Sequence, residues 1–186
     1  AARDLKLDEA HGIDIRFTGN ALMLQEELET VKDGMGIVGA ISLTLVFVLL
    51  IIGLSSVRLV AATLITLITG LIWTAAFAVA AFEALNIISV AFAVLFIGLS
   101  VDFGIHFALR YRESIGVDGP REALKRAGMG VGMALLLSAV SAAIGFLSFL
   151  PTDYSGVAEL GVISGVGMFI ALCLNLTLLP ALLSVM

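Results

Sequence analysis

Five long runs of apolar residues follow one another along the chain after residue 34. They lie at about 35–54, 59–82, 84–109, 128–150 and 160–185. Each run reaches the roughly 20 residues that an α-helix needs to cross the hydrocarbon core of a bilayer. Most of the connections between them are short, so successive runs should be antiparallel neighbours. We therefore predict an all-α membrane protein in which residues 34–186 form a bundle of five transmembrane helices.

The first 33 residues have a different pattern, in which polar and apolar positions are mixed. Residues 13–17 alternate as Ile-Asp-Ile-Arg-Phe, which is typical of a half-buried strand. Residues 21–33 repeat apolar side chains at helical spacing and predict an amphipathic helix. Because one strand and one helix cannot bury a core of their own, we expect residues 1–33 to be the α+β end of a larger aqueous domain.

The connection after the third run, at residues 111–127, is the longest and holds a further predicted helix. Pro120 follows Asp118-Gly119, and proline is favoured in the first turn of a helix. The residues after it repeat alanine and leucine on one side, with charged residues between them. We expect a helix near 119–127 to lie along the membrane surface.

The basic residues after Gly34 all belong to one end of the predicted bundle. They are Arg58, Arg110, Arg112, Arg121, Lys125 and Arg126. The turns at the opposite end hold the acidic Glu83, Asp153 and Glu159, with no lysine or arginine. By the positive-inside rule the basic end is cytoplasmic, which places residues 1–33 in the periplasm and the C-terminus in the cytoplasm.

The composition agrees with a lipid environment and argues against several classes of function. Hydrophobic residues make up 60% of the chain, far above a soluble domain. The net charge of -5 comes mainly from the N-terminal piece, and we expect no nucleic-acid partner. The single Cys173 and the absence of a His/Cys cluster predict no metal site. Without a nucleophile, a paired carboxylate or a phosphate loop in an aqueous setting, we predict no enzyme and no cofactor.

One acidic residue, Asp102, lies deep inside the third predicted span. It is eight residues, roughly 12 Å at the helical rise, from the first basic residue, Arg110. An ionised aspartate at the centre of a span costs about 2.5 kcal/mol or more, so we expect this side chain to face the bundle or a water-filled cavity. A carboxyl group that alternates between neutral and charged forms suits proton transport. The alternative is a structural polar contact between helices.

Several residues are candidates to act with Asp102. His106 lies one helical turn after it and Gly98 one turn before it, so the three share a face. A proton relay to His106 is one interpretation, because imidazole titrates near neutral pH; a ring that points to the lipid headgroups is the other. Gly104 is the second small residue expected to allow helix packing around the acid. Polar residues that could contact it are Ser138, Ser141, Asn175 and Thr177.

The segment around Asp102 resembles a known membrane motif. The residues Gly98-Leu-Ser-Val-Asp102-Phe-Gly-Ile-His106, followed by Arg110-Tyr-Arg-Glu113, resemble the fourth transmembrane helix of the resistance-nodulation-division superfamily. The match is closest to its lipid-exporting branch, the MmpL-like and hopanoid-exporter-like proteins. It implies that the chain covers spans two to six of one half of a transporter, preceded by the end of a periplasmic domain. This block is called a sterol-sensing domain in related eukaryotic proteins.

The resemblance also implies a function and its partners. It implies a bacterial inner-membrane exporter of hydrophobic lipids such as hopanoids, driven by the proton motive force, with Asp102 as the proton carrier. The second half of the transporter and a homo-oligomer, a dimer or a trimer, are the implied protein partners. Related proteins carry a second aspartate or a tyrosine where this chain has Phe103, so the proton partner is either His106 or a residue of the other half.

Two other functions fit the same block of five spans. One is a module of the sterol-sensing type that binds lipid between its helices and regulates a partner. The other is an accessory subunit of protein export, because such subunits carry a similar Gly-x-x-Val-Asp motif. The ending Leu178-Leu179-Pro180-Ala181-Leu182-Leu183 favours the lipid exporters over the latter.

Overall fold

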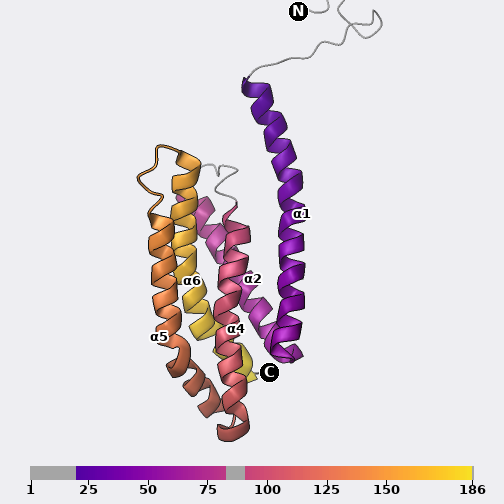
Figure 1. Cartoon of the computed structure of the whole chain (residues 1–186), viewed down its shortest axis with the longest axis vertical. Helices are drawn as coiled ribbons and strands as arrows, with labels where there is room; N and C mark the ends of the chain where they lie inside the picture. The colour runs from indigo at the N-terminus through magenta and orange to yellow at the C-terminus, as the bar shows by residue number, and fades with distance from the viewer. Residues whose placement is uncertain (1–19, 83–90, 186) are drawn as a thin grey trace, which may run out of the picture. The chain divides into compact units, whose positions relative to one another are not determined.

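The computed structural model describes residues 20–82 and 91–185 of the chain (Figure 1). This part of the chain forms the helices α1 (Asn20–Leu54), α2 (Val57–Ala81), α4 (Phe92–Asp118), α5 (Pro120–Leu147) and α6 (Ser155–Val185). Each of these helices holds a stretch long and apolar enough to cross a membrane. The prediction of an all-α membrane protein with five spans is therefore confirmed for the described residues.

The first span continues an earlier helix without a break. α1 begins at Asn20, so the amphipathic helix predicted at 21–33 and the span predicted at 35–54 form one helix. No proline separates the two segments, and the leucine and glutamate residues before the span are good helix formers. A change from polar to apolar residues therefore marks the edge of the membrane part and not the end of the helix.

The chain divides into two compact units, Ala1–Gly36 and Ile37–Met186. The stretches that can span a membrane lie almost wholly in the second unit, although α1 begins in the first. The strand predicted at residues 13–17 belongs to the first unit and lies outside the described residues. The α+β character of that unit therefore stays a prediction.

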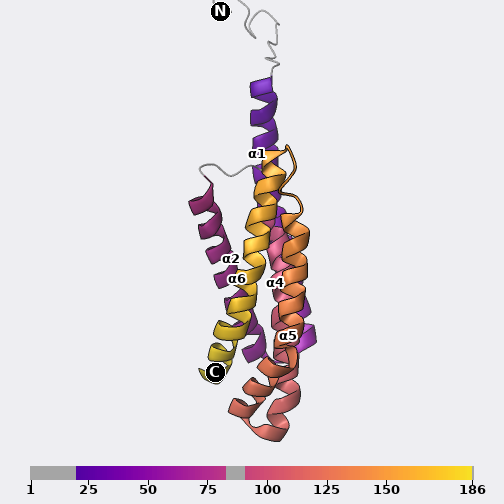
Figure 2. The same cartoon turned by 90° about the vertical axis from the view of Figure 1, so that its left-hand side faces the viewer.

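The connection between α4 and α5 is much shorter than the sequence pattern indicates. α4 continues to Asp118, and α5 begins with Pro120 in its first turn, so only Gly119 separates them. Gly119 has a φ of 76°, in the left-handed region that glycine adopts without strain. The helix predicted near 119–127 is thus the first part of α5 and not a separate element. Figures 1 and 2 show that α5 bends between this first part and the rest.

The helices α2, α4, α5 and α6 run side by side and pack against one another (Figure 2). α6 contacts each of the other three helices. Buried apolar side chains form two clusters, one around Phe107 and Leu179 and the other around Phe96 and Ile163. In contrast, most side chains of α1 from Ile37 onward are exposed, as expected for a span that faces lipid or further protein.

Four buried polar side chains of α2 and α6 form hydrogen bonds within their own helices. Thr63, Thr66 and Thr74 of α2 each donate a hydrogen bond of 2.8 Å to the carbonyl oxygen four residues earlier. Asn175 of α6 donates from Nδ2 to the carbonyl oxygen of Ala171 at 2.9 Å. Since an unpaired polar group is costly in an apolar interior, this local bonding lets the bundle bury hydroxyl and amide groups without polar contacts between helices.

Arg112 of α4 connects this helix to the end of α1. Its Nη1 donates to the carbonyl oxygen of Leu54 at 2.9 Å and to that of Gly53 at 3.4 Å. The last carbonyl groups of a helix have no partner within it, and they carry the negative end of the helix dipole. The guanidinium group of Arg112 donates hydrogen bonds to these carbonyl groups, and its positive charge is attracted by the negative end of the dipole. The turn between α1 and α2 is therefore held beside the end of α4, with Ser55 in the left-handed region at a φ of 48°.

The basic residues of the membrane part lie at one end of the bundle. Arg58 is in the first turn of α2, Arg110 and Arg112 are in the last turns of α4, and the remaining basic residues begin α5. Figure 1 shows the α1–α2 turn, the α4–α5 junction and the last turn of α6 at this same end. We refer to it as the basic end.

Candidate functional site

Asp102 lies near the middle of α4, on a side of the helix that the other described helices leave uncovered. Its side chain is exposed. It forms no hydrogen bond or ion pair with any residue in the described ranges. The next residue, Phe103, is only 4% exposed. The acid of the third span therefore points away from the core of this bundle, and the phenylalanine after it points inward.

The residues that share the side of Asp102 form a continuous strip, which we call the open face of α4. It consists of Leu95, Gly98, Asp102, His106 and Glu113, all exposed. Their spacings of three, four and seven residues put them on one side of a helix. A Cβ atom at Gly98 would meet no atom within 4 Å, so this position is open space in the described part of the chain. The strip combines the carboxyl group of Asp102, the imidazole of His106 and, at Gly98, a position without a side chain.

The opposite side of α4 is the packed face, made by Phe96, Phe103, Gly104, Phe107 and Tyr111, all buried. Gly104 is the position of closest approach to its neighbours. A Cβ atom there would lie 2.6 Å from Cγ2 of Thr63 in α2 and 3.2 Å from Oδ1 of Asn175 in α6. Only a glycine allows these helices to approach so closely.

The residues predicted to surround Asp102 are divided between these two faces. Gly98 and His106 lie on the open face with the acid. Gly104 and Asn175 do come together, but Gly104 is two residues from Asp102, which places this contact on the far side of α4. Asn175 is 2% exposed, and its amide nitrogen bonds within α6.

The hydroxyl groups predicted as partners of Asp102 form no hydrogen bond with it in the described part of the chain. Ser138 and Ser141 of α5 are both exposed and form no hydrogen bond to Asp102 within the described residues. Thr177 of α6 donates to the carbonyl oxygen of Cys173 at 2.6 Å. A polar partner for Asp102 therefore has to come from His106 or from protein outside these helices.

The sequence reasoning missed the threonines of α2. Thr63 and Thr74 lie where α2 meets glycines of other helices: a Cβ at Gly104 would be 2.6 Å from the Thr63 methyl group, and one at Gly167 would be 2.9 Å from that of Thr74. The helical spacing of threonines in an otherwise apolar span is a signal that could have indicated this contact between α2 and the glycines of α4 and α6. It positions α4, although it contributes no group to the open face.

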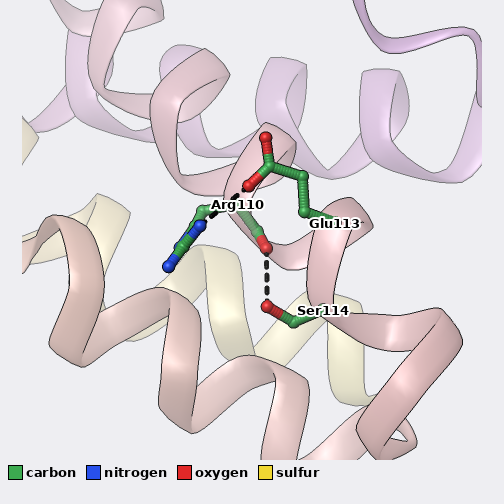
Figure 3. Close-up of polar contacts among 3 residues, drawn as sticks. All are labelled: Arg110, Glu113 and Ser114. Atoms are coloured by element: carbon green, nitrogen blue, oxygen red, sulfur yellow. Dashed lines mark hydrogen bonds and ion pairs between the residues drawn. The ribbon is translucent and has the colours of Figure 1, made fainter.

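The open face ends at the basic end in an ion pair. Arg110 Nη1 lies 2.9 Å from Oε2 of Glu113, and the hydroxyl of Ser114 donates to the Arg110 carbonyl oxygen at 3.1 Å (Figure 3). The two charged side chains are 50% and 64% exposed, so water weakens their attraction. The stem of Arg110 reaches α5, where a Cβ at Gly130 would be 3.2 Å from its Nε.

The chemistry available to this arrangement is proton binding. Asp102 and His106 are separated by one helical turn, and each can exist in a charged and a neutral form. In the described part of the chain, no group of three or more His, Cys, Asp or Glu side chains could hold a metal ion. The carboxyl group and the imidazole thus lie on a helix face that the described helices leave open to a further partner.

Comparisons with known proteins agree with this architecture. The MMPL family model matches residues 1–186. The chain is 47% identical over 183 residues to the hopanoid transporter HpnN of Burkholderia multivorans and 43% identical over 187 residues to that of Rhodopseudomonas palustris. A membrane protein of Methanocaldococcus jannaschii is 27% identical over 177 residues, which cover 92% of this chain and 45% of that protein.

The two hopanoid transporters are much longer than this chain. The alignments cover 98% and 100% of this chain but only 21% and 22% of those relatives. The chain thus spans about a fifth of their length. The resemblance to the lipid-exporting branch of the resistance-nodulation-division superfamily, found from the motif around Asp102, is confirmed by these matches. The chain belongs to the MMPL family.

Proposed function

We propose that this chain is a membrane block of a proton-driven exporter of hydrophobic lipids of the hopanoid class, with Asp102 as the proton carrier. The lipid class is supported by the two related hopanoid transporters. The proton role is supported above all by one observation: an acid and an imidazole lie one turn apart on a mid-span helix face that no described helix covers.

The exposure of Asp102 indicates what covers it in the longer protein. A charged aspartate at the centre of a span costs about 2.5 kcal/mol or more in lipid, so bare contact with lipid chains is unfavourable. This chain spans only about a fifth of its relatives, which leaves ample protein to cover the open face. We assign that position to the second half of the transporter, whose polar groups or trapped water would solvate Asp102 and His106.

Protonation of Asp102 then changes how the open face can pack. A neutral carboxyl group tolerates an apolar neighbour, whereas the carboxylate requires a polar partner or water. A difference of ~2.5 kcal/mol between the two packings corresponds to a factor of about 70 in their ratio. One proton could therefore shift a two-state equilibrium of α4 from mostly one arrangement to mostly the other.

The packed face provides the mechanical connection for such a shift. The packed face holds α4 against its neighbours through the buried Phe103 and Phe107. At Gly104 the side chains of Thr63 and Asn175 lie so close that there is no room even for a methyl group. Because close-packed interiors do not deform gradually, a displacement of α4 would carry α2 and α6 with it. In this way a charge change at Asp102 would move a group of helices and not one side chain.

The proposal includes a placement in the cell. The basic end faces the cytoplasm, the first unit belongs to a periplasmic domain, and the protein resides in a bacterial inner membrane as a homo-oligomer. The basic residues at one end of the bundle support this orientation through the positive-inside rule.

The test uses the full-length protein in proteoliposomes that hold a hopanoid in the membrane and an imposed proton gradient. We expect Asp102→Asn to lower gradient-driven hopanoid transport at least tenfold, while the variant inserts and remains folded because its side chain has no partner in this bundle. Asp153→Asn, in the exposed turn before α6, is the matched control and should keep full transport. Unchanged transport by Asp102→Asn would exclude the proton role. Hopanoid binding by the wild type without flux would instead favour the lipid-sensing module.

A further inference from the structure

A cavity of about 220 Å³ lies at the basic end between α2, α4 and α6. Its polar wall is made by Ser56, Arg58, Tyr111 and Arg112, and it is far larger than one water molecule requires. Arg112 lies ten residues, roughly 15 Å along α4, beyond Asp102. This cavity is therefore separate from the open face and plays no part in the proposed proton site.

Several hydrogen-bond donors at this cavity have no partner among the described residues. Tyr111 is 7% exposed, yet its hydroxyl forms no hydrogen bond with the described part of the chain. Ser56 is the N-cap residue of α2 but makes no capping hydrogen bond with its side chain. The first backbone bond of α2 runs from Val60 N to Ser56 O at 3.0 Å, so the earlier N–H groups of this helix stay available. A tyrosine hydroxyl without a partner among the described residues and the first N–H groups of α2 are thus available to an acceptor at this cavity.

The positive charge of the residues that line the cavity favours an anionic acceptor. Arg58 and Arg112 both line it, and no acidic residue does. Arg112 uses Nη1 for the carbonyl groups of α1, and its other nitrogens make no hydrogen bond with described residues. The nearest carboxylate along the chain, Glu113, is paired with Arg110. Two guanidinium groups with a hydroxyl and a helix N-terminus are the donors that bind a phosphate group.

An adjoining cavity shows where the rest of such a ligand would lie. It measures about 370 Å³ and lies between α1 and α2, and Ser56 lines both cavities. Its walls are mainly apolar, with Phe47, Ile51 and Val60 among them. An apolar groove beside a phosphate-binding cavity fits an acyl chain next to a headgroup. Basic pockets between transmembrane helices bind anionic lipids in this way.

We propose that the basic end is a specific binding site for an anionic phospholipid. The phosphate group lies between Arg58, Tyr111 and Arg112, and an acyl chain follows the groove between α1 and α2. The bound lipid bridges the turn that Arg112 already holds and the end of α4. It acts as a structural lipid of the leaflet at the basic end and is distinct from the exported lipid.

The test is native mass spectrometry of the full-length protein in a neutral detergent, titrated with dioleoylphosphatidylglycerol. We expect the wild type to bind this lipid at least tenfold more tightly than dioleoylphosphatidylcholine. Arg58→Gln should weaken binding about fivefold, the equivalent of ~1 kcal/mol, because one of the two guanidinium groups that line the cavity is lost. Tyr111→Phe should weaken it about tenfold, because a hydrogen bond to a charged acceptor is lost while the ring remains.

Arg121→Gln is the matched control, since Arg121 is an exposed basic residue of the same end that does not line the cavity. It should bind the lipid as the wild type does. The melting temperature of each variant, measured without lipid, separates loss of binding from loss of folding. Equal affinity for the two lipids, or unchanged binding in both cavity variants, would overturn the proposal. Displacement of the lipid by millimolar inorganic phosphate would also overturn it and indicate a site for the free anion.

Discussion

The two faces of α4 differ in what they contribute to the protein. The packed face buries aromatic rings and one glycine against α2 and α6, and it determines where α4 lies in the bundle. The open face presents Asp102, His106 and Gly98, which are exposed, and neither Asp102 nor His106 forms a hydrogen bond with another described residue. One helix thus separates the residues that build the fold from those proposed to carry protons. Asp102 and Phe103 are neighbours in the chain and belong to different faces.

This separation has a physical reason. An unpaired carboxylate is costly in an apolar interior, and the packed face of α4 carries no acidic residue. The packed side in turn has to be dense, because in lipid the helices associate mainly through close van der Waals contact. Variants on the packed face should therefore change stability, and variants on the open face should change transport.

Gly104→Ala should have the largest effect on folding. The added methyl group would lie 2.6 Å from the Thr63 methyl and 3.2 Å from Oδ1 of Asn175, and overpacking of this kind costs about 1–3 kcal/mol. Thermal unfolding of the full-length protein in detergent measures the change. Gly98→Ala is the matched control: its methyl meets nothing within 4 Å in this bundle, and alanine favours the helix by up to ~1 kcal/mol.

The same pair of variants tests whether the two faces of α4 differ in role. If the open face is a contact surface for the second half, Gly98→Ala should lower hopanoid transport although the bundle stays stable. If Gly98→Ala instead destabilised the protein as much as Gly104→Ala, the open face would be a structural interface like the packed one.

The sequence was sufficient to predict the spans but not their ends. Spans are evident because a helix in lipid needs a long apolar run. The third span was expected to end at 109, and α4 in fact ends at Asp118. The last was expected to begin at 160, and α6 begins at Ser155. Helices leave the membrane without stopping, since arginine, glutamate and lysine favour the helix as well as leucine does.

Arg112→Gln should have a smaller effect, of about 1 kcal/mol, confined to the end of α1. The loss removes charged hydrogen bonds to the carbonyl groups of Leu54 and Gly53, which lie at 2.9 and 3.4 Å. Hydrogen exchange of the last turn of α1, measured in neutral detergent, reports it. Arg110→Gln is the control, because its ion pair with Glu113 is exposed and is worth no more than ~0.5 kcal/mol. Equal effects of the two variants would contradict the assigned contact.

The site was predictable in part for a similar physical reason. The helical period places Gly98, Asp102 and His106 on one side of α4, and all three are exposed in the structure. It does not reveal which side of α4 packs: in lipid, a side that carries Asp102 and His106 is expected to face the bundle, whereas the described helices leave this side uncovered. The expected position of Asn175 near the acid, instead of behind Gly104, follows from this ambiguity.

His106→Gln should have the smallest effect on folding, within about 0.5 kcal/mol, because the exposed ring has no contact that this bundle depends on. The effect of this variant on transport distinguishes the two interpretations of His106. Glutamine keeps hydrogen-bonding groups but does not titrate, so a relay from Asp102 to His106 predicts a loss close to that of Asp102→Asn in the same proteoliposomes. A ring that only reaches toward headgroups predicts transport near the wild-type level. In that case the proposed second half, and not His106, would supply the partner of Asp102.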